Sequence, residues 1–386
     1  MSSSEQSFER RGIVEGFFGP PWSMAERRLL FGFGARRGLN TYLYAPKDDP
    51  YHRLRWRDPY PKSEWRELLR LIAAAQSKDI DFVYGFHPGE RLCFSERKPV
   101  QILIDKAQRF YDAGVRTFAV LFDDIPSRLV YARDRRAFGE SLARAEGSWL
   151  GAIQQRQPQW WKDVEWWICP SCYSEDPLLE KMFGRFESSF LEKLAEGLPA
   201  DVACLWTGPA VVSEKITVKH ARQIARRVNH RLLLWDNYPV NDLSMASELH
   251  IGPLTGRGRR LPEIVYGYLN NPMLQPTLSL VPLATCFDYA AKPCSYDPET
   301  SWRRVIKQRF GAEALTYWRT IRWFLEASQQ LTKAKQSTRI TVRQNARLES
   351  ALAYLRTVSK QKWAHEIRPW RRQIETTVKN GVLGLS

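Results

Sequence analysis

The first 290 residues alternate, eight times over, a short apolar, β-branched or aromatic run with a longer stretch of helical periodicity. The short runs occupy residues 12–18, 40–46, 81–87, 117–124, 165–170, 203–208, 231–237 and 263–270. Between them, stretches such as 63–77 and 178–195 repeat apolar residues every three to four positions, as amphipathic helices do. This alternation predicts a (β/α)8 barrel. A doubly wound open sheet is the alternative, but no Gly-x-Gly-x-x-Gly follows the first run to support a dinucleotide site.

The chain changes character after this region. Residues 301–386 hold 18 Lys and Arg against five Asp and Glu, whereas residues 1–300 hold 40 against 37. Helical periodicity begins near 296, with Asp297 or Thr300 as its cap, and two further helices are predicted over 339–360 and 362–378. We therefore expect a catalytic barrel over 10–292 and a small basic α-helical bundle over 296–386.

The basic bundle is compatible with three interpretations. Its Lys and Arg side chains can form an ordinary solvated surface. They can also bind an acidic partner, which would be a nucleic acid, an anionic polymer or an acidic protein. In the third interpretation the chain self-associates as a homodimer and the bundle lies beside the active site of the neighbour.

Targeting signals and cysteine usage limit the compartment. The start "MSSSEQSFERRG" has no apolar core of a signal peptide, and no run approaches the roughly 18 apolar residues of a membrane span. Six cysteines are scattered along the chain, which favours reduced thiols in a cytoplasmic protein. Cys169 and Cys172 form a Cys-x-x-Cys pair, but the two further ligands of a structural zinc site are missing at matching spacing.

Polar residues follow most of the predicted strands. In a (β/α)8 barrel these positions meet at one mouth, where the chemistry of such folds lies. Asp123 and Asp124 end the fourth run side by side. Adjacent carboxylates repel, so a site that keeps both uses them to bind a cation or to divide acid and base roles. Other runs are followed by Gly16, by Lys47, Asp48 and Asp49, by Tyr173, by Asp236, Asn237, Asn241 and Asp242, and by Asn270 and Asn271.

This set of side chains favours sugar chemistry. No nucleophile-elbow motif is present, and His52, His87 and His250 are isolated, which indicates packed or surface residues. Asp, Asn, Lys and Trp together donate to and accept from sugar hydroxyls, and paired carboxylates perform glycosidic acid–base work. A magnesium or calcium site at Asp123 and Asp124 is the alternative, and it needs further oxygen ligands. Asp48 and Asp49 are either a second acidic pair or a solvated turn. We expect no cofactor and no metal.

Seven separated motifs, in order over residues 12–290, resemble one known family. They are "GIVEGFFGPPWS", "NTYLYAPKDDPYHRLRW", "FAVLFDDI", "CPSCY", "LWTGPAVVS", "LLLWDNYPVND" and "LNNP". Together they are similar to glycoside hydrolase family 84, which contains protein O-GlcNAcases and hyaluronidase-like β-N-acetylglucosaminidases. The stretch "YDPETSW" also resembles the start of the helical region that follows the barrel in that family.

The resemblance implies a retaining exo-β-N-acetylglucosaminidase that uses no enzymatic nucleophile. In such enzymes the 2-acetamido oxygen of the substrate attacks the anomeric carbon and forms an oxazoline intermediate. By position, Asp123 matches the residue that orients and polarises the acetamido group. Asp124 matches the general acid that later acts as base on water. Neighbouring carboxylates in different environments can hold different pKa values and so divide these roles.

Other positions match binding residues of that family. Gly16 matches a glycine whose carbonyl faces the sugar, and Lys47 a lysine that reaches its hydroxyls. Tyr173 matches a tyrosine near the reacting centre, and Asn237 an asparagine near the acetamido group. The remaining matches are Cys169 and Trp235 beside the acetamide pocket, which equally suit core packing, and Asp242 and Asn271 at the outer sugar hydroxyls.

Three departures from the family pattern border the aglycone side. Phe18 stands where the family often has tyrosine, residues 141–150 read "SLARAEGSWL", and residues 87–95 read "HPGERLCFS". They concern the natural substrate more than the chemistry. The expected partner is a glycoprotein or glycan that carries N-acetylglucosamine (GlcNAc). The alternative function is a non-catalytic sugar- or polyanion-binding protein whose basic helices dock a glycosylated or nucleic-acid partner.

Overall fold

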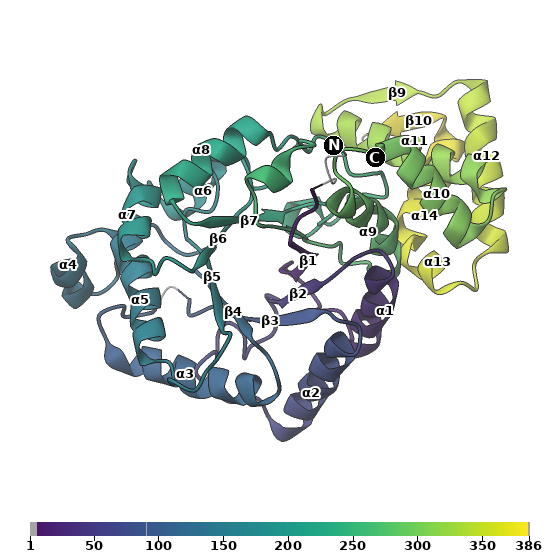
Figure 1. The fold of residues 1–386 in the computed structure, drawn as a ribbon. Helices are drawn as coiled ribbons and strands as arrows, with labels where there is room; N and C mark the ends of the chain where they lie inside the picture. The colour runs from purple at the N-terminus through teal and green to yellow at the C-terminus, as the bar shows by residue number, and fades with distance from the viewer. Residues whose placement is uncertain (1–5, 90, 385–386) are drawn as a thin grey trace, which may run out of the picture. The chain divides into compact units, whose positions relative to one another are not determined.

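Eight parallel strands close into a barrel in the computed structural model, which describes residues 6–89 and 91–384 (Figure 1). They are β1 (Arg10–Glu15), β2 (Thr41–Tyr44), β3 (Asp81–Phe86), β4 (Thr117–Leu121), β5 (Glu165–Cys169), β6 (Ala203–Trp206), β7 (Arg231–Asp236) and β8 (Gly267–Asn270). Each strand pairs with the next one, and β8 pairs back with β1. The predicted (β/α)8 barrel is therefore confirmed.

The eighth predicted run is longer than its strand. It was expected from residue 263, whereas β8 begins at Gly267. A 3-10 turn, η2 (Leu261–Glu263), ends at the first residue of the run. The N–H groups of Ile264 and Val265 bond back to the Leu261 carbonyl at 2.9 Å each, so these residues belong to the turn and not to the strand ladder.

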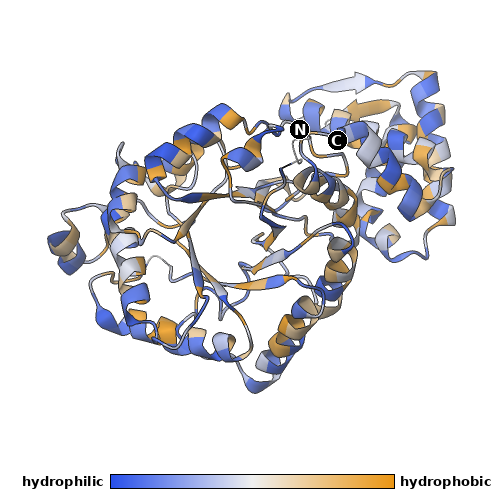
Figure 2. Cartoon of the chain, viewed as in Figure 1, coloured by the Kyte–Doolittle hydropathy of each residue, from blue (hydrophilic) through white to orange (hydrophobic). Residues whose placement is uncertain are grey.

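Helices follow the strands and surround the barrel (Figure 1). They are α1 (Met24–Ala35), α2 (Lys62–Gln76), α3 (Arg97–Asp112), α4 (Ala132–Phe138), α5 (Leu142–Arg156), α6 (Pro177–Phe183), α7 (Phe190–Gly197) and α8 (Val218–Val228). Apolar and hydrophilic residues alternate around these helices, as Figure 2 shows. The apolar stripe faces the strands, and its burial removes hydrocarbon from water.

Local sequence signals fix several helix ends. Ser23 and Glu26 form a reciprocal capping box at the start of α1. The single periodic stretch at 178–195 becomes two helices, α6 and α7, because Gly184 ends the first with φ of +98°. A residue with a side chain is strained in that conformation, so the helix ends there.

Two acidic residues at strand ends form buried ion pairs that stabilise the fold. Glu15 at the end of β1 accepts two bonds from the Arg27 guanidinium, one of them 2.8 Å from Nε, and Tyr42 donates to it as well. Asp236 at the end of β7 accepts from Arg257 Nε at 2.8 Å and Nη2 at 2.6 Å. Both carboxylates are fully buried. Each is neutralised by a bidentate guanidinium, the geometry that makes such burial tolerable.

The chain divides into two compact units. The first comprises residues 1–238, 255–272 and 287–296, and contains the barrel. The second comprises residues 239–254, 273–286 and 297–386, so it includes two segments that precede the expected helical bundle. Helix α9 (Pro276–Ala291) has residues in both units. No helix among the described residues has the length and apolar character needed to cross a bilayer.

The second unit is mainly helical, as expected. Its elements are the 3-10 turn η1 (Leu243–Met245), α10 (Pro298–Phe310), α11 (Ala314–Lys333), β9 (Ser337–Arg339), α12 (Val342–Thr357), α13 (Lys362–Glu366), α14 (Arg368–Asn380) and β10 (Val382–Gly384). Asp297 caps α10 by accepting the N–H of Thr300 at 2.8 Å. The strands β9 and β10 form a small antiparallel pair that periodicity does not reveal.

Tryptophans form the core of this unit. Trp302, Trp318, Trp363 and Trp370 are all buried. The rings of Trp318 and Trp363 lie 5.3 Å apart between centroids, and Phe310 stacks on Trp318 at 4.3 Å. These aromatic faces are therefore used for packing rather than exposed for stacking against a ligand.

Candidate active site

The barrel brings most of the predicted site residues to one end. Parallel strands place their carboxyl ends at the same mouth, and the segments after β1, β2, β4, β5, β7 and β8 all carry predicted residues. At this mouth the described contacts form two clusters. One, the carboxylate cluster, is built from Lys47, Asp123, Asp124 and Tyr173. The other, the amide cluster, is built from Gly16, Trp235, Asn237 and Asn271.

Lys47 and Asp123 form a buried ion pair at the centre of the carboxylate cluster. Burial would raise the pKa of the Asp123 carboxyl, but the Lys47 ammonium outweighs it and lowers that pKa to about 2. Burial would lower the pKa of Lys47, and the Asp123 and Asp124 carboxylates instead raise it above its ordinary value. Both groups are therefore charged across the neutral range.

One oxygen of Asp123 is available to a ligand. Lys47 occupies Oδ2, whereas Oδ1 is buried and accepts no hydrogen bond within the described residues. A buried carboxylate oxygen without a donor is costly, and such an atom in a site is usually completed by a bound molecule. A ligand N–H or O–H directed at Oδ1 would meet a fixed negative charge.

Asp124 lies in a different environment from its neighbour. Its Oδ1 accepts from the Tyr173 hydroxyl at 2.8 Å, and its Oδ2 lies 3.3 Å from Lys47 Nζ. Burial and then the Asp124 charge raise the pKa of Tyr173 well above its usual value, so the phenol stays a donor. The Asp124 side chain is 18% exposed and that of Asp123 7%, so Asp124 is the carboxylate nearer to water.

The amide cluster is a chain of hydrogen bonds that joins three strand ends. Asn237 Oδ1 accepts from Trp235 Nε1 and from Asn271 Nδ2, both at 3.0 Å. Asn271 Oδ1 in turn accepts the N–H of Gly16 at 3.2 Å. Asn237 Nδ2 donates to the carbonyl of Val211 at 2.8 Å. The two amide groups are therefore held in one orientation, which pre-organises polar groups for a ligand.

Gly16 has no room for a side chain. A Cβ added there would overlap the six-membered ring of Trp235, which Asn237 holds in place. We predict that Gly16→Ala displaces the indole, costs about 1–3 kcal/mol of folding free energy and lowers ligand binding at the amide cluster. Thermal unfolding and KM measure the two effects. Gly32→Ala in α1 is the control, because nothing lies within 4 Å of its added Cβ. Equal behaviour of the two variants would contradict the packing argument.

The ring of Phe18, one of the departures from the family pattern, has two cations near it. Lys47 Nζ is 5.4 Å from the centroid of its ring, and the Arg53 guanidinium is 5.2 Å from it. An aromatic face attracts cations at such distances. Phe18 therefore supports the position of Lys47 without offering the hydroxyl that a tyrosine would present.

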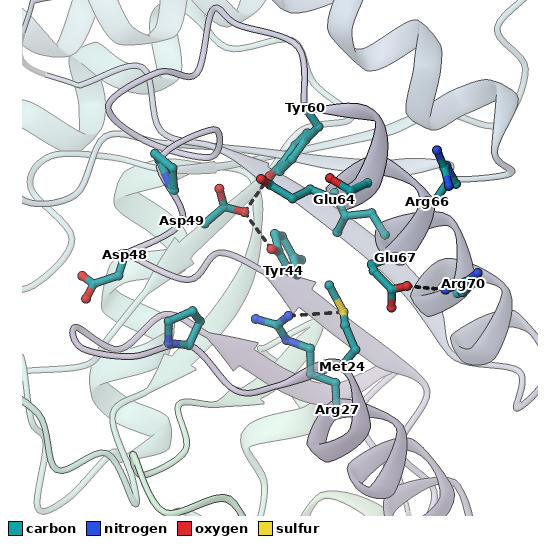
Figure 3. Close-up of a pocket in the computed structure, with 14 residues that line it drawn as sticks. Met24, Arg27, Tyr44, Asp48, Asp49, Tyr60, Glu64, Arg66, Glu67 and Arg70 are labelled. Carbon is teal, nitrogen blue, oxygen red and sulfur yellow. Dashed lines mark hydrogen bonds and ion pairs between the residues drawn. The ribbon is translucent and has the colours of Figure 1, made fainter.

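The two neighbouring aspartates after Lys47 have separate roles. Asp49 is buried and accepts from the Tyr44 and Tyr60 hydroxyls at 2.7 Å each (Figure 3). It also accepts the N–H of Tyr51 at 2.8 Å. Asp48 is exposed. The pair thus forms a turn, with Asp49 as its structural anchor. A cavity of about 470 Å³ lies beside this turn, between α1 and α2 (Figure 3). None of the residues that line it belongs to the carboxylate cluster.

The cysteines near the mouth are unreactive thiols. Cys169, at the end of β5, is buried, and burial raises its pKa well above the ordinary value. Burial likewise raises the pKa of Cys172 to about 12. A thiolate is the nucleophilic form, so neither residue is activated at neutral pH. Among the described residues, no group of three or more His, Cys, Asp or Glu is arranged to hold a metal ion.

Asp242 and Asn241 belong to the second unit. Asp242 precedes η1, and the backbone N–H of Met245 bonds to its carbonyl at 2.9 Å. Asn241 is buried and donates to Gln275 Oε1 at 2.8 Å. The role of Asp242 at sugar hydroxyls remains a prediction.

Two buried residues near the site were not expected there. His87 contacts the backbone of Asp123, as described below, and Glu146 in α5 supports the segment that leads to Tyr173. Glu146 Oε2 accepts the N–H of Ser171 at 3.2 Å, and Oε1 is buried and has no hydrogen bond to any residue that the structure describes. Burial raises the pKa of Glu146 to about 8. The carboxyl therefore stays protonated at neutral pH.

Glu146 makes folding depend on pH. The unfolded chain ionises this carboxyl above about pH 4.5, and the folded protein does so only near 8. Stability from this group is full below pH 4.5 and is lost as the pH rises through 8. We predict that Glu146→Gln stabilises the protein by about 4 kcal/mol more at pH 8 than at pH 4.5. Urea unfolding at both pH values measures this, and Glu64→Gln on the exposed face of α2 is the control. A difference of zero would contradict the assignment.

Comparison with known proteins connects this geometry to a family. The model of the β-N-acetylglucosaminidase family (NAGidase) matches residues 11–322. Protein O-GlcNAcases of Rattus norvegicus and Mus musculus are each 36% identical over 263 residues, which is 68% of this chain and 28% of theirs. The chain thus spans less than a third of the length of these curated relatives.

Solved structures agree with this comparison. A mutant of the Thermobaculum terrenum O-GlcNAc hydrolase superposes with a TM-score of 0.84 at 32% identity, covering 96% of this chain and 82% of that one. CpGH84B superposes with a TM-score of 0.82 at 27% identity, covering 98% and 68%. The chain belongs to the β-N-acetylglucosaminidase family, whose members are glycoside hydrolases. The resemblance drawn from the seven motifs is confirmed.

Proposed function

We propose that this chain is a retaining exo-β-N-acetylglucosaminidase of the O-GlcNAcase type, which removes terminal β-linked GlcNAc. The observation that carries the proposal is the pair of unequal carboxylates. Asp123 is buried, charged and paired with Lys47 through one oxygen, while Asp124 is the more exposed and accepts from Tyr173. A sugar-binding protein without activity needs hydroxyl binders but has no use for two such carboxylates.

The first chemical step uses the acetamido group of the substrate. Asp123 Oδ1 accepts the acetamido N–H, and the fixed negative charge makes the acetamido oxygen a better nucleophile. That oxygen forms a bond to the anomeric carbon as the bond to the aglycone breaks. Asp124 donates a proton to the departing oxygen, and an N-protonated oxazoline (an oxazolinium ion) remains, whose N–H still bonds to Asp123 Oδ1.

The second step reverses these roles. Asp124, now unprotonated, takes a proton from water as the water oxygen bonds to the anomeric carbon. The bond to the acetamido oxygen breaks, and GlcNAc leaves with its β configuration retained. Two inversions at one carbon give this outcome. Because the nucleophile belongs to the substrate, the usual spacing of two catalytic carboxylates does not apply.

The remaining matched residues bind the sugar in this proposal. Lys47 holds Asp123 and reaches a sugar hydroxyl, and Tyr173 steadies Asp124. Gly16, Asn237 and Asn271 offer backbone and amide groups, with Trp235 and Cys169 beside the acetamide. Asp242 supplies a further carboxylate to the outer hydroxyls.

The physiological setting is also a proposal. Six free cysteines favour a cytoplasmic location. The substrate is a GlcNAc-bearing glycoprotein or glycan. The basic helices of residues 301–386 bind an acidic partner or take part in a homodimer. Binding to a polyanion such as heparin should weaken steeply between 50 and 200 mM salt. An affinity for heparin that does not change with salt would contradict the proposal of an acidic partner.

Fluorination of the acetamido group tests the substrate-assisted mechanism. Each fluorine withdraws electrons and weakens the acetamido oxygen as a nucleophile. We expect kcat to fall steeply from N-acetyl to N-difluoroacetyl to N-trifluoroacetyl 4-nitrophenyl glucosaminides, and NMR to detect the β-hemiacetal first. Equal rates along the series, or the α-anomer as first product, would contradict the mechanism. No turnover of any of them, with GlcNAc binding intact, would support the binding protein instead.

A further inference from the structure

His87 contacts the backbone of the segment that carries the two carboxylates. It follows β3 and is buried, and its Nε2 lies 2.7 Å from the backbone carbonyl oxygen of Asp123. A carbonyl oxygen only accepts, so Nε2 carries the proton in this bond. The same nitrogen is 4.0 Å from Asp123 Oδ1, beyond hydrogen-bond distance. His87 therefore contacts the main chain of this segment and not the Asp123 carboxylate, which pairs with Lys47.

The surroundings keep this imidazole neutral. Burial, then repulsion from Lys47, lowers the pKa of His87 to about 4. Its Nδ1 is buried and makes no hydrogen bond among the described residues. His52 lies edge-on to it at 6.1 Å between ring centroids, and burial lowers the pKa of His52 well below the usual value. In the neutral range His87 is a hydrogen-bond donor and takes no part in acid–base exchange.

The bonded carbonyl controls the conformation of Asp124. It belongs to the peptide group that links Asp123 to Asp124, and Asp124 has φ of +62°. Left-handed backbone is unfavourable for a residue with a side chain, although Asp tolerates it better than most. Just before it, the N–H of Phe122 bonds to the Cys169 carbonyl at 2.8 Å. Two peptide groups of this segment are thus anchored, the one that precedes Phe122 by β5 and the one that links Asp123 to Asp124 by His87.

We propose that His87 is a positioning residue, which holds the Asp123 carbonyl so that Asp124 keeps the left-handed conformation that directs its carboxyl at the leaving group. This inference rests on the proposed function, in which Asp124 is the acid. Without the donor, the peptide group can rotate toward the commoner right-handed or extended conformations. The Asp124 carboxyl would then move away from the Tyr173 hydroxyl, while Asp123 would keep its ion pair with Lys47.

Leaving-group dependence distinguishes positioning from simple packing. His87→Phe and His87→Leu fill the space without a donor, and His87→Gln keeps an amide N–H at similar reach. We expect the donorless variants to lose about 10- to 100-fold in kcat on methyl β-GlcNAc, part of what a general acid contributes. On 2,4-dinitrophenyl β-GlcNAc, whose leaving group needs no proton, the loss should be under about threefold. His87→Gln should restore most of the activity on the methyl glycoside.

His52→Phe is the matched control, since it removes the buried imidazole next to His87, whose Nδ1 bonds to the Gly85 carbonyl at 2.8 Å and not to the segment of Asp123. It should affect both substrates equally. An equal loss on both substrates for the His87 variants, or no loss, would overturn the positioning role. Should neither donorless variant fold, the ¹⁵N signals of the wild-type imidazole decide. A proton on Nε2 from pH 5 to 8 supports the proposal, and a proton on Nδ1 overturns it.

The two proposals fail in distinguishable ways. If the wild type hydrolyses neither substrate, the proposed function is wrong. If the wild type is active and Asp124→Asn shows the leaving-group dependence but His87→Phe does not, only the inference about His87 is wrong.

Discussion

An Asp124→Asn variant should hydrolyse methyl β-GlcNAc about 10²- to 10⁴-fold more slowly than the wild type, which is the range that a positioned general acid contributes. The amide cannot donate a carboxyl proton to the departing alkoxide, although it can still accept from Tyr173. On 2,4-dinitrophenyl β-GlcNAc the first step needs no proton. There we expect a much smaller loss, and intermediate aryl glycosides should show a steeper dependence on leaving-group pKa than in the wild type.

Asp123→Asn is the matched control for this prediction. It removes the charge that polarises the acetamido oxygen, which every substrate needs, so its loss should be similar for good and poor leaving groups. Initial rates of the three proteins across one aryl series measure both behaviours. A uniform loss for Asp124→Asn, or a leaving-group-dependent loss for Asp123→Asn, would mean that the two carboxylates have been assigned the wrong way round.

Replacing Lys47 with methionine should have the largest combined effect. Methionine fills the space but leaves Asp123 buried without its cation. Removing one partner of a buried ion pair costs about 3–5 kcal/mol, so we expect a marked fall in the free energy of unfolding at pH 7. Activity should nearly disappear, because burial without Lys47 favours the protonated Asp123 and removes the polarising charge.

The pH dependence of stability checks this assignment. In the wild type the folded pKa of Asp123 is lowered to about 2, so its contribution to stability is present above about pH 4 and is lost as the pH falls toward 2. In Lys47→Met this loss should vanish. The double variant Lys47→Met with Asp123→Asn should recover stability at pH 7 but not activity, because no buried charge remains unpaired. If the double variant stays unstable, the lost free energy of unfolding comes from altered packing and not from an unpaired buried charge.

The architecture of the barrel could be predicted because its signal is local and repeated. Each strand is a short run buried on both faces, and each helix carries an apolar stripe, so eight units can be counted directly. The helix ends inside the periodic stretches were harder to predict. Gly184 and Gly311 take φ of +98° and +93° and end α6 and α10, yet glycine inside a periodic stretch signals a helix end only when that conformation is adopted.

The candidate site could be predicted in part for a similar reason. Residues that follow strands meet at one mouth, which places Lys47, Asp123 and Tyr173 together without knowledge of side-chain contacts. The hydrogen bond from His87 to the Asp123 carbonyl could not be predicted, because a main-chain acceptor carries no sequence signal. The position of His87 directly after β3 was the available indication in the sequence that it lies at the mouth of the barrel. The burial of Glu146 could not be predicted, because a carboxyl in a helix usually faces water.

The division of the chain into two units could not be predicted in full from the sequence. Residues 239–254 and 273–286 pack with the C-terminal helices although they fall inside the expected barrel. Trp302 and Trp370 donate from that unit to the carbonyls of Ile251 at 2.7 Å and Ser247 at 2.8 Å. Such contacts join residues more than 50 positions apart, so neither composition nor periodicity reveals them.

The measurement that tests the central claim most directly is hydrolysis of 4-nitrophenyl β-GlcNAc beside 4-nitrophenyl β-glucoside by the wild-type protein. The two differ only in the 2-acetamido group, which is the nucleophile in the proposed mechanism. We predict release of 4-nitrophenol from the first and none from the second. Equal rates on both, or turnover of the glucoside alone, would contradict a mechanism in which the acetamido oxygen attacks the anomeric carbon.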